Sequence, residues 1–416
     1  MTVDGREIQN EFDTLGSVVI HNPDIGIGYI SPDVAEQLLY DDIVFMPRMV
    51  EEHQIFSKVL RTLIHGMNVL EFEDLLADVL KIPEERELLL SELNKAEHFS
   101  KEIVAQIKTF EPLELSQVLI SGMDFNSKAW IKPIPNLVFT RDLGCVINGH
   151  LLISKMKKEA RRRESFLFKS IVRAHPLFRR FQGKIIDSSD EEKVSRKISL
   201  EGGDLMIVHP DYLLVGISER TSWEAFCWLK EKLFELDIVK NIISVKLPNE
   251  RYCMHLDTVF TIVNEKTCVG YAPLVFEKNG ALDVLKFTKD VSGYFSYSSL
   301  ADLIKEVYPA MTFIPCGGGK APFDAREQWT DGANLFAINN LVCLSYERNV
   351  HTLNAFRDIG FHVIDAKHLL QMSEDERKRS LDQSTIVTVP SAELSRARGG
   401  PHCMTFPMYR YVGNSK

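Results

Sequence analysis

The run Tyr212-Leu-Leu-Val-Gly-Ile-Ser-Glu-Arg220 is an apolar stretch of strand length that ends in a polar Glu-Arg corner. Residues 223–236 follow with apolar side chains at helical spacing, and residues 242–247 form a second strand pattern. The order of strand, Glu-Arg corner, helix and strand recurs at 341–365, and residues 150–185 resemble a third copy. Strand–helix–strand units are common in α/β proteins, but their self-similarity here predicts a repeat-built α/β architecture.

Two further strands are predicted near the start of the chain. Residues 16–20 and 42–46 are short apolar runs bounded by turn signals, and residues 49–69 carry a helical pattern. The α/β alternation therefore begins before the first complete copy of the repeated unit.

The hydrophobic pattern of the sequence is different between residues 72 and 123. Apolar side chains recur there at helical spacing, with almost no strand candidates. Pro83 and Pro112 fall between the helical runs, where proline is tolerated. We therefore expect an all-helical insertion at 72–123 and an α/β body formed by residues 1–71 and 124–416.

Composition excludes several classes of protein. The 416 residues carry a formal net charge of −9, which argues against a general nucleic-acid binder because such proteins need a basic face. No apolar run reaches the roughly 18 residues of a membrane span. The seven cysteines form no Cys-x-x-Cys pair, so a zinc knuckle is not expected, and their sparse, odd number suits a reducing cytoplasm.

Chemically rich residues gather in four short segments that lie far apart in the sequence. They are centred on Asp142, Glu201-Gly-Gly-Asp204, His255-Leu-Asp257 and Gly399-Gly-Pro-His-Cys403. On a strand, the spacing of His255 and Asp257 would place both side chains on one face. A cysteine, a histidine and a carboxylate form the set used in covalent catalysis. Further carboxylates match the planar fork of a guanidinium group, so the set suits attack on a guanidinium carbon.

Each of these segments also has a structural interpretation. A lone histidine is more often a hydrogen-bonded core residue, and a lone cysteine is more often an inert apolar side chain. Asp142 could cap a turn, and Glu201-Gly-Gly-Asp204 could be a plain loop. The run Arg161-Arg-Arg-Glu164 could be a solvated helix face. Taken singly, no segment decides the function.

Taken together, the segments resemble the bacterial arginine deiminase family of the guanidino-group modifying enzymes. The matching motifs are Gly16-Ser-Val-Val-Ile-His21, Leu39-Tyr-Asp-Asp-Ile-Val-Phe45, Phe139-Thr-Arg-Asp142, Glu201-Gly-Gly-Asp204, His255-Leu-Asp257-Thr-Val-Phe260, Arg326-Glu-Gln-Trp-Thr-Asp-Gly332-Ala-Asn334 and Gly399-Gly-Pro-His-Cys403. The resemblance implies a five-bladed α/β propeller of ββαβ modules, with the helices at 72–123 as the family's insertion. It also implies hydrolysis of L-arginine to L-citrulline and ammonia, without a metal or an organic cofactor.

The resemblance also assigns roles to individual residues. Cys403 matches the nucleophile that forms a covalent thiouronium intermediate, and His255 matches the proton shuttle. Glu201 matches the carboxylate that pairs with His255, whereas Asp142 and Asp257 match the acids that grip the guanidinium nitrogens. Asn136, Arg161 and Arg220 match the residues that hold the substrate's α-carboxylate. Arg398 matches a mobile arginine near the mouth of the pocket.

One departure from the family pattern leaves other functions open. Pro401 stands where the family usually has a third glycine before the His-Cys pair, and proline fixes φ and removes an N–H. The alternatives are a related guanidine-modifying reaction, such as agmatine deimination, amidino transfer or hydrolysis of a modified arginine, and a non-catalytic arginine-binding protein. The expected partners are L-arginine and further copies of the chain, as a dimer or tetramer, without nucleic acid or membrane.

Overall fold

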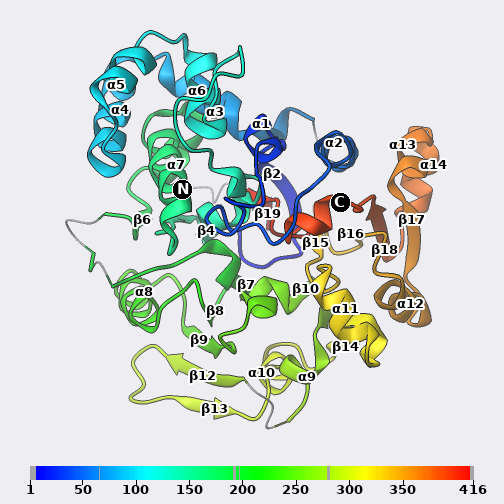
Figure 1. The fold of residues 1–416 in the computed structure, drawn as a ribbon. Coiled ribbons are helices and arrows are strands. Elements are labelled where there is room, and N and C mark those ends of the chain that lie inside the picture. Colours follow the sequence, from blue (N-terminus) through cyan, green and yellow to red (C-terminus); the bar gives the residue numbers. More distant parts are fainter. Residues whose placement is uncertain (1–5, 65, 191–193, 196, 279–281, 413–416) are drawn as a thin grey trace.

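Five mixed β-sheets carry the described part of the chain, and none of them closes on itself. The structure is a computed structural model that describes residues 6–64, 66–190, 194–195, 197–278 and 282–412. Figure 1 shows that sheets and helices follow one another around the centre in chain order, with most helices on the outside. Among the described helices, none combines the length and the apolar composition that a bilayer crossing requires.

Nineteen strands within the described residues build these sheets. The first sheet has the order β1 (Arg6–Glu7), β19 (Phe406–Tyr411), β2 (Thr14–Ile20), β3 (Val69–Glu71). The second has β4 (Gly144–Ile147), β5 (His150–Ile153), β6 (Ile185–Asp187), and the third has β13 (Phe295–Tyr297), β12 (Asp283–Thr288), β9 (Asn241–Lys246), β8 (Tyr212–Ile217), β7 (Leu205–His209). The fourth has β10 (Phe260–Asn264), β11 (Thr267–Gly270), β14 (Thr312–Pro315), and the fifth has β15 (Phe336–Ala337), β16 (Val342–Tyr346), β18 (Thr385–Val389), β17 (His362–Asp365).

The α-helices fill the connections between these strands. They are α1 (Ile25–Gly28), α2 (Met46–Leu63), α3 (Phe72–Leu80), α4 (Pro83–Glu97), α5 (Lys101–Ile107), α6 (Pro112–Ser121), α7 (Arg162–Ala174), α8 (Trp223–Glu235), α9 (Ala272–Val275), α10 (Leu300–Val307), α11 (Phe323–Trp329), α12 (Val350–Asp358), α13 (Ala366–Gln371) and α14 (Glu374–Ser380). Short 3₁₀ turns occupy many of the corners, including those that carry the site.

One unit recurs in the sheets. β7 and β8 are antiparallel, α8 follows β8, and β9 then returns parallel to β8. The second sheet repeats this order with β4, β5, α7 and β6. The strand–helix–strand predictions at 212–247 and 150–185 are therefore confirmed. At 341–365 the elements are also present, but β17 pairs with β18 instead of β16.

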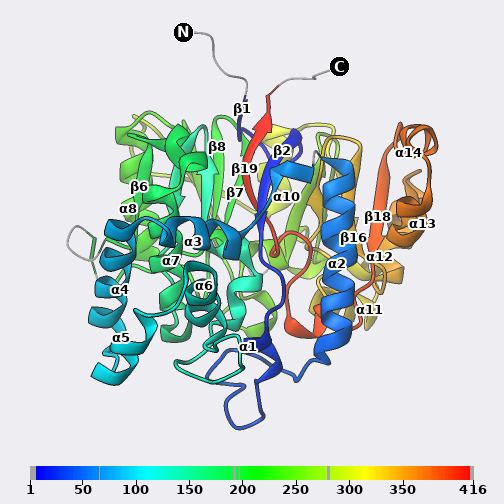
Figure 2. The ribbon, with the colours of Figure 1, turned by 90° about the horizontal axis from the view of Figure 1, so that it is seen from above.

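The stretch at 72–123 is helical, as the sequence predicts, and consists of α3 to α6. These helices share a core with the body, because Leu76 and Leu119 belong to the same apolar cluster as Phe168 and Ile171 of α7. Figures 1 and 2 both place α3 and α6 beside α7. The helices therefore pack as part of the body's core.

The strand predicted at 42–46 is wrong. Residues 43–45 have no sheet partner, and α2 begins at Met46 with Pro47 at its first positions. Proline is favoured there because the first helical N–H has no partner within the helix. The N–H of Phe45 instead donates to Glu393 Oε2 at 2.7 Å.

The last strand brings the end of the described chain back to its beginning. β19 lies between β1 and β2 and is antiparallel to both, and Figure 2 shows β2 and β19 side by side. Just before β19, the carbonyl of Cys403 accepts the N–H of Arg141 at 3.0 Å, and the carbonyl of Met404 accepts the hydroxyl of Thr140 at 3.1 Å. The 403 segment is thereby held against the 140–142 corner.

Candidate active site

Three of the four chemically rich segments line one small pocket, and the fourth, Glu201-Gly-Gly-Asp204, contacts it through the bond between Glu201 and His255. It is lined by Leu39, Asn136, Phe139, Asp142, Arg161, Arg220, Arg251, Met254, His255, Thr258, Ala397, Arg398 and Cys403. Its free volume is about 20 Å³, which is room for about one water molecule. The residues are therefore assembled around a nearly closed cavity, and an amino acid can enter only if part of the lining moves.

His255 lies between two carboxylates. Its Nε2 is 2.9 Å from Glu201 Oε2, and its Nδ1 is 3.7 Å from Asp142 Oδ1. Burial disfavours the charged ring, but the charge of Asp142 and the hydrogen bond to Glu201 outweigh burial and raise the pKa of His255 to about 9. His255 is therefore protonated at neutral pH in the free protein.

His255 and Asp257 do not share a strand face. Residues Leu256–Thr258 form a 3₁₀ turn, and His255 is the residue that precedes it. The backbone N–H of Leu256 donates to Asp204 Oδ1 at 3.0 Å, so a buried carboxylate from the second segment holds this turn. The shared face would have required a strand, which this segment does not form, yet the turn still directs both side chains into the same cluster.

The two glycines of the second segment are explained by close contacts. A Cβ at Gly202 would lie 2.0 Å from the carbonyl oxygen of Arg141, and a Cβ at Gly203 would lie 2.9 Å from Asp142 Oδ1. The N–H of Gly203 donates to that same oxygen at 3.2 Å. Only glycine lets this backbone pack against the 141–142 corner and present Glu201 to His255.

Cys403 is buried among acids. Its thiol donates to Asp257 Oδ2 at 3.4 Å, and only 5% of the residue is exposed. Burial and the charges of Asp257 and Asp142 raise the pKa of the Cys403 thiol well above its ordinary value. The sulfur is therefore a protonated thiol in the free protein.

Behind Cys403, a histidine links two carboxylates. His402 Nδ1 lies 2.9 Å from Asp257 Oδ2, and His402 Nε2 lies 3.3 Å from Glu11 Oε2. Burial opposes ionisation of Glu11, but the hydrogen bond to His402 and the charge of Arg141 lower its pKa to about 2. This row of buried hydrogen bonds fixes the orientation of Asp257.

Arg161 reaches into the carboxylate cluster itself. Its Nη1 donates to Asp142 Oδ2 at 2.5 Å and lies 3.6 Å from Glu201 Oε2. Its Nε donates to Glu164 at 3.0 Å, and its Nη2 donates to the carbonyl of Asn136 at 3.2 Å. The guanidinium of Arg161 is therefore paired with the carboxylate of Asp142, which the resemblance assigns to the guanidinium of the substrate.

Arg220 and Asn136 both line this pocket, but they differ in how far their hydrogen-bond donors are used. Nε and Nη1 of Arg220 are buried and have no hydrogen-bond partner among the described residues, although Nη1 lies 3.7 Å from Glu201 Oε2. The side-chain amide of Asn136 donates to the carbonyl of Leu38 at 2.7 Å and so holds the 38–39 corner over the pocket. Arg220 thus offers unused donors, whereas the NH₂ of Asn136 already has a partner.

Arg398 lies against an aromatic ring at the edge of the pocket. Its guanidinium carbon is 3.4 Å from the centre of the Trp329 ring, and its Nη1 is 4.0 Å from Asp41 Oδ2. The backbone of Arg398 is left-handed, with φ of 67°, which is uncommon for a residue with a side chain. A cation–π contact and a distant carboxylate hold it.

The described residues also contain a group with the geometry of a metal site. One ligand atom each from Asp142, Glu201 and His255 lie within 4.8 Å of one another. In this structure those carboxylates are already in ion pairs with Arg161, so the cluster is organised around a guanidinium.

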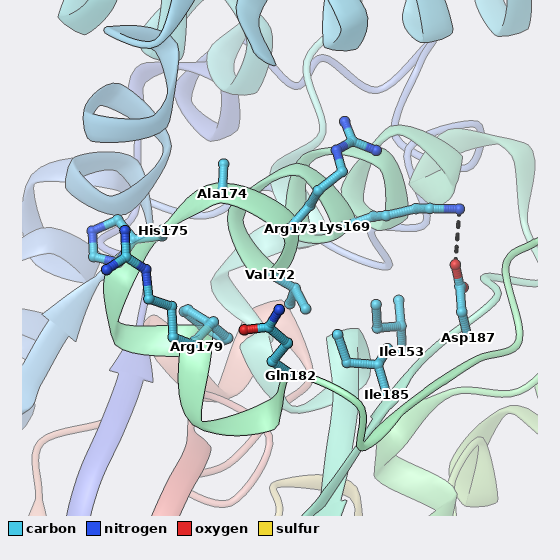
Figure 3. A pocket seen from close by; sticks show the side chains of 11 residues that line it. Ile153, Lys169, Val172, Arg173, Ala174, His175, Arg179, Gln182, Ile185 and Asp187 are labelled. Carbon is cyan, nitrogen blue, oxygen red and sulfur yellow. Dashed lines mark ion pairs between the residues drawn. The ribbon is translucent and has the colours of Figure 1, made fainter. Parts of the chain in front are cut away.

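A second pocket lies elsewhere and contains none of the candidate residues. Figure 3 shows this cavity of about 530 Å³ under α7, with Ile153, Val172 and Ile185 along its apolar wall. Lys169 and Asp187 form an ion pair of 2.8 Å at its side. It is larger than the cavity at Cys403, but the chemically rich segments do not reach it.

Sequence reasoning missed four buried residues of the cluster. They are Glu11, Glu164, Asn334 and His402. Asn334 and His402 stand inside matching motifs, so a motif signal exists for both. Glu164 belongs to the run that was interpreted as a possible solvated face, and nothing in the sequence distinguishes Glu11 from other acids.

This arrangement defines an α/β protein with a buried cysteine, histidine and carboxylate cluster at the meeting point of several sheets. The family model described as arginine deiminase matches residues 36–112 and 87–410, and the chain belongs to the arginine deiminase family.

Relatives support this membership over the whole length. The arginine deiminase of Listeria monocytogenes is 32% identical over 429 residues, covering 97% of each chain. That of Listeria innocua is 33% identical over 438 residues, covering 99% of each chain. A solved amidinotransferase from Microseira wollei, of a saxitoxin biosynthetic pathway, has the same α/β fold with a TM-score of 0.55, 11% identity and coverage of 99% of both chains.

Proposed function

We propose that this protein is an arginine deiminase, which hydrolyses L-arginine to L-citrulline and ammonia. The observation that carries this proposal is the buried thiol of Cys403 on Asp257, in one pocket with Asp142 and the protonated ring of His255. Membership of the arginine deiminase family supports the same reaction.

The first half of the reaction forms a covalent adduct. The Cys403 thiolate attacks the guanidinium carbon, and a carbon–sulfur bond forms while one C=N bond becomes single. His255 then donates its proton to the departing nitrogen, so that ammonia leaves and a thiouronium remains on the sulfur. The raised pKa of His255 suits it to this task, because the ring still holds a proton at neutral pH.

The second half uses the same histidine in the opposite direction. Neutral His255 takes a proton from water, and the resulting hydroxide attacks the thiouronium carbon. The carbon–sulfur bond then breaks while the new hydroxyl loses its proton to solvent and becomes the carbonyl of citrulline. Citrulline leaves, and Cys403 departs as a thiolate. Glu201, 2.9 Å from Nε2, stabilises the protonated ring and fixes its orientation in both steps.

The cationic substrate itself promotes ionisation of the nucleophile. In the free protein the charges of Asp257 and Asp142 raise the pKa of the thiol. A guanidinium placed between these acids and the sulfur neutralises that field, and nearby positive charge lowers a thiol's pKa. Asp142 and Asp257 then grip the guanidinium nitrogens through charge-assisted hydrogen bonds.

At the other end of the substrate, we assign the α-carboxylate to Arg220, Arg161 and Asn136. Arg220 has two buried nitrogens that no residue in the described part of the chain hydrogen-bonds. Arg161 must leave Asp142 when the substrate's guanidinium arrives, and the substrate's carboxylate gives it a new partner. Arg398, at the edge of the pocket on Trp329, is the side chain that moves to admit arginine.

Four wider features belong to the same proposal. The recurrence of the ββαβ order supports the arrangement of the five sheets as five blades of an α/β propeller. We treat 72–123 as an insertion into a catalytic body made of 1–71 and 124–416. We also propose that the protein is cytoplasmic, and that it is a homodimer or homotetramer.

A substrate panel tests the function. Purified protein is given arginine, agmatine, methylated arginines and citrulline, and products are identified by mass spectrometry. We expect citrulline and ammonia from arginine, and a Cys403→Ala variant that makes neither while still binding arginine in calorimetry. Cys227→Ala, at a half-buried cysteine outside the pocket, is the matched control. Arginine binding without turnover in the unmodified protein would favour a non-catalytic binder.

A further inference from the structure

Asn334 is the one side chain of the cluster that contacts the nucleophile, the segment that carries it and the Asp257 turn together. It is fully buried in the loop between α11 and β15. Its Nδ2 donates to the sulfur of Cys403 at 3.1 Å and to the carbonyl oxygen of Asp257 at 2.8 Å. Its Oδ1 accepts the backbone N–H groups of His402 and Cys403, each at 3.1 Å.

The orientation of this amide is fixed by its partners. Two backbone N–H groups can only donate, so the atom that faces them must be the carbonyl oxygen. The NH₂ group is therefore turned toward the sulfur and the Asp257 carbonyl. The amide of Asn334 is thus a hydrogen-bond donor to the reacting atom.

The surroundings hold Asn334 rigidly against the nucleophile segment. A Cβ at Gly400 would lie 2.6 Å from Oδ1 of Asn334, so the backbone passes as close as glycine allows. On the other side, the hydroxyl of Thr261 in β10 donates to the carbonyl of Ala333 at 2.7 Å and accepts the N–H of Leu335 at 3.2 Å. The loop that carries the amide is therefore tied to strand β10 on both sides of Asn334.

The sulfur needs such a donor because its other close neighbours are acids. Burial and the charges of Asp257, Asp142 and Asp331 disfavour the thiolate, whereas a backbone hydrogen bond from Gly400 favours it. We infer that Asn334 is a further catalytic residue, whose amide N–H stabilises the Cys403 thiolate when it attacks and again when it leaves. This inference rests on the proposed function for its catalytic meaning, but the contact with the sulfur can be tested without turnover.

Alkylation of the substrate-free protein tests the contact. Asn334→Asp retains an oxygen at the position that accepts the N–H groups of His402 and Cys403, and Asn334→Ser is an uncharged variant with a shorter side chain; both lose the NH₂ donor. Iodoacetamide labelling is followed for the Cys403 peptide by mass spectrometry as a function of pH. A hydrogen bond to a charged group predicts that labelling at pH 8 slows about 10-fold or more in both variants.

Asn349→Asp is the matched control. Asn349 is also fully buried and donates from Nδ2 to the carbonyl of Thr330 at 3.0 Å, in the same region of the fold. The Asn349→Asp substitution also replaces a buried amide with a carboxylate, but it leaves the amide of Asn334 at the sulfur in place. We expect wild-type labelling of Cys403 in this variant, with folding of all variants checked by circular dichroism.

The outcomes separate this inference from the proposed function. An unchanged labelling profile of Cys403 in Asn334→Ser overturns the inference. A change of labelling confined to Asn334→Asp also overturns it, because the added negative charge alone would explain such a change. If labelling shifts while the wild-type protein releases no citrulline, the sulfur contact stands and the proposed function fails. With turnover present, kcat falls about 10-fold or more while KM for arginine changes little.

A spectroscopic measurement detects the contact in the wild-type chain itself, with variants used only for assignment and control. In protein labelled with ¹⁵N at asparagine, the side-chain amide signal that disappears in Asn334→Ser is followed as pH rises. It should shift with the titration of Cys403, and the shift should vanish in Cys403→Ala. A signal that ignores the thiol titration would refute the contact.

Discussion

Asp142 acts on both reacting groups at once. Its charge raises the pKa of His255, where it opposes the effect of burial, and it adds to burial and Asp257 in raising the pKa of Cys403. The free protein therefore holds a protonated histidine and a protonated thiol. The thiol must lose its proton before the attack. The positive charge of the arriving substrate favours this loss because it stabilises the thiolate.

Asp142→Asn should lower the pKa of His255, because the charge that raises it most strongly is removed. The pKa of about 9 in the native chain should move toward the ordinary value of 6.5. NMR titration of His255 in a Cys403→Ala background measures this shift without turnover. An unchanged titration in the asparagine variant would mean that Asp142 does not set the protonation of His255.

Asp331→Asn is the control for that experiment. Asp331 is also buried, and its charge raises the pKa of Cys403, but it is not among the groups that shift His255. We expect easier alkylation of Cys403 in this variant and an unaltered His255 titration.

Arg220→Ala should discriminate between two substrates. Agmatine lacks the carboxylate that Arg220 is proposed to bind, so only arginine loses a partner. A charge-assisted hydrogen bond predicts a rise of about 10-fold or more in KM for arginine, with little change for agmatine. Steady-state kinetics with both substrates measures this, and equal losses for the two would reject the carboxylate assignment.

The sequence predicted which side chains gather at the site better than how they interact. Cys403, His255, Glu201, Asp142 and Asp257 do lie in one cluster, because motif order indicates the family. Their roles, and those of the four arginine- and asparagine-type residues around them, stay predictions. The contact of Arg161 with Asp142 could not be foreseen, since it depends on the rotamer that a long side chain adopts in a closed pocket.

At the scale of elements, regular periodicity was a reliable guide and short irregular stretches were not. The helices at 72–123 and the strands of the repeated unit follow from apolar spacing over many residues. The false strand at 42–46 and the 3₁₀ turn at 256–258 are both too short for periodicity to decide. Tertiary partners, Glu393 in one case and Asp204 in the other, fix these segments instead.

A charged cluster joins β2, α1 and β3 at the base of the segment that covers the pocket. His21 follows β2 and lies 2.9 Å from Glu71 Oε1 and 3.1 Å from Asp24 Oδ2, and Asp24 also caps α1. Burial opposes the charge of His21, but the hydrogen bonds to Asp24 and Glu71 outweigh it and raise the pKa to about 10.

This cluster predicts a loss of stability at alkaline pH. Because the pKa of His21 is higher in the folded chain than its ordinary 6.5, the stabilisation is fully present below about pH 6.5 and is lost as pH rises toward 10. Urea unfolding at several pH values should show a steeper alkaline fall for the native chain than for His21→Gln. Parallel pH curves for the two proteins would exclude the cluster as a source of pH dependence.

At the scale of the whole molecule, Arg410 fastens the last strand to two other parts of the fold. It is fully buried in β19, and it donates to the carbonyl of Asp13 at 2.6 Å and to that of Ala337 at 2.9 Å. Arg410→Met should lower the free energy of unfolding by about 2–4 kcal/mol, because both bonds to a charged group are lost. Urea unfolding checks this against Arg377→Met on the exposed helix α14, which should cost much less.

The pairing of β19 with β2 has a consequence for a chain that is still being translated. The strand that completes the first sheet is the last described element to leave the ribosome, and the sulfur of Cys403 comes only just before it. A polypeptide translated only as far as α14 therefore has neither the complete first sheet nor the nucleophile. At that stage the nascent chain cannot attack free arginine, although the histidine and the acids of the cluster have already been synthesised.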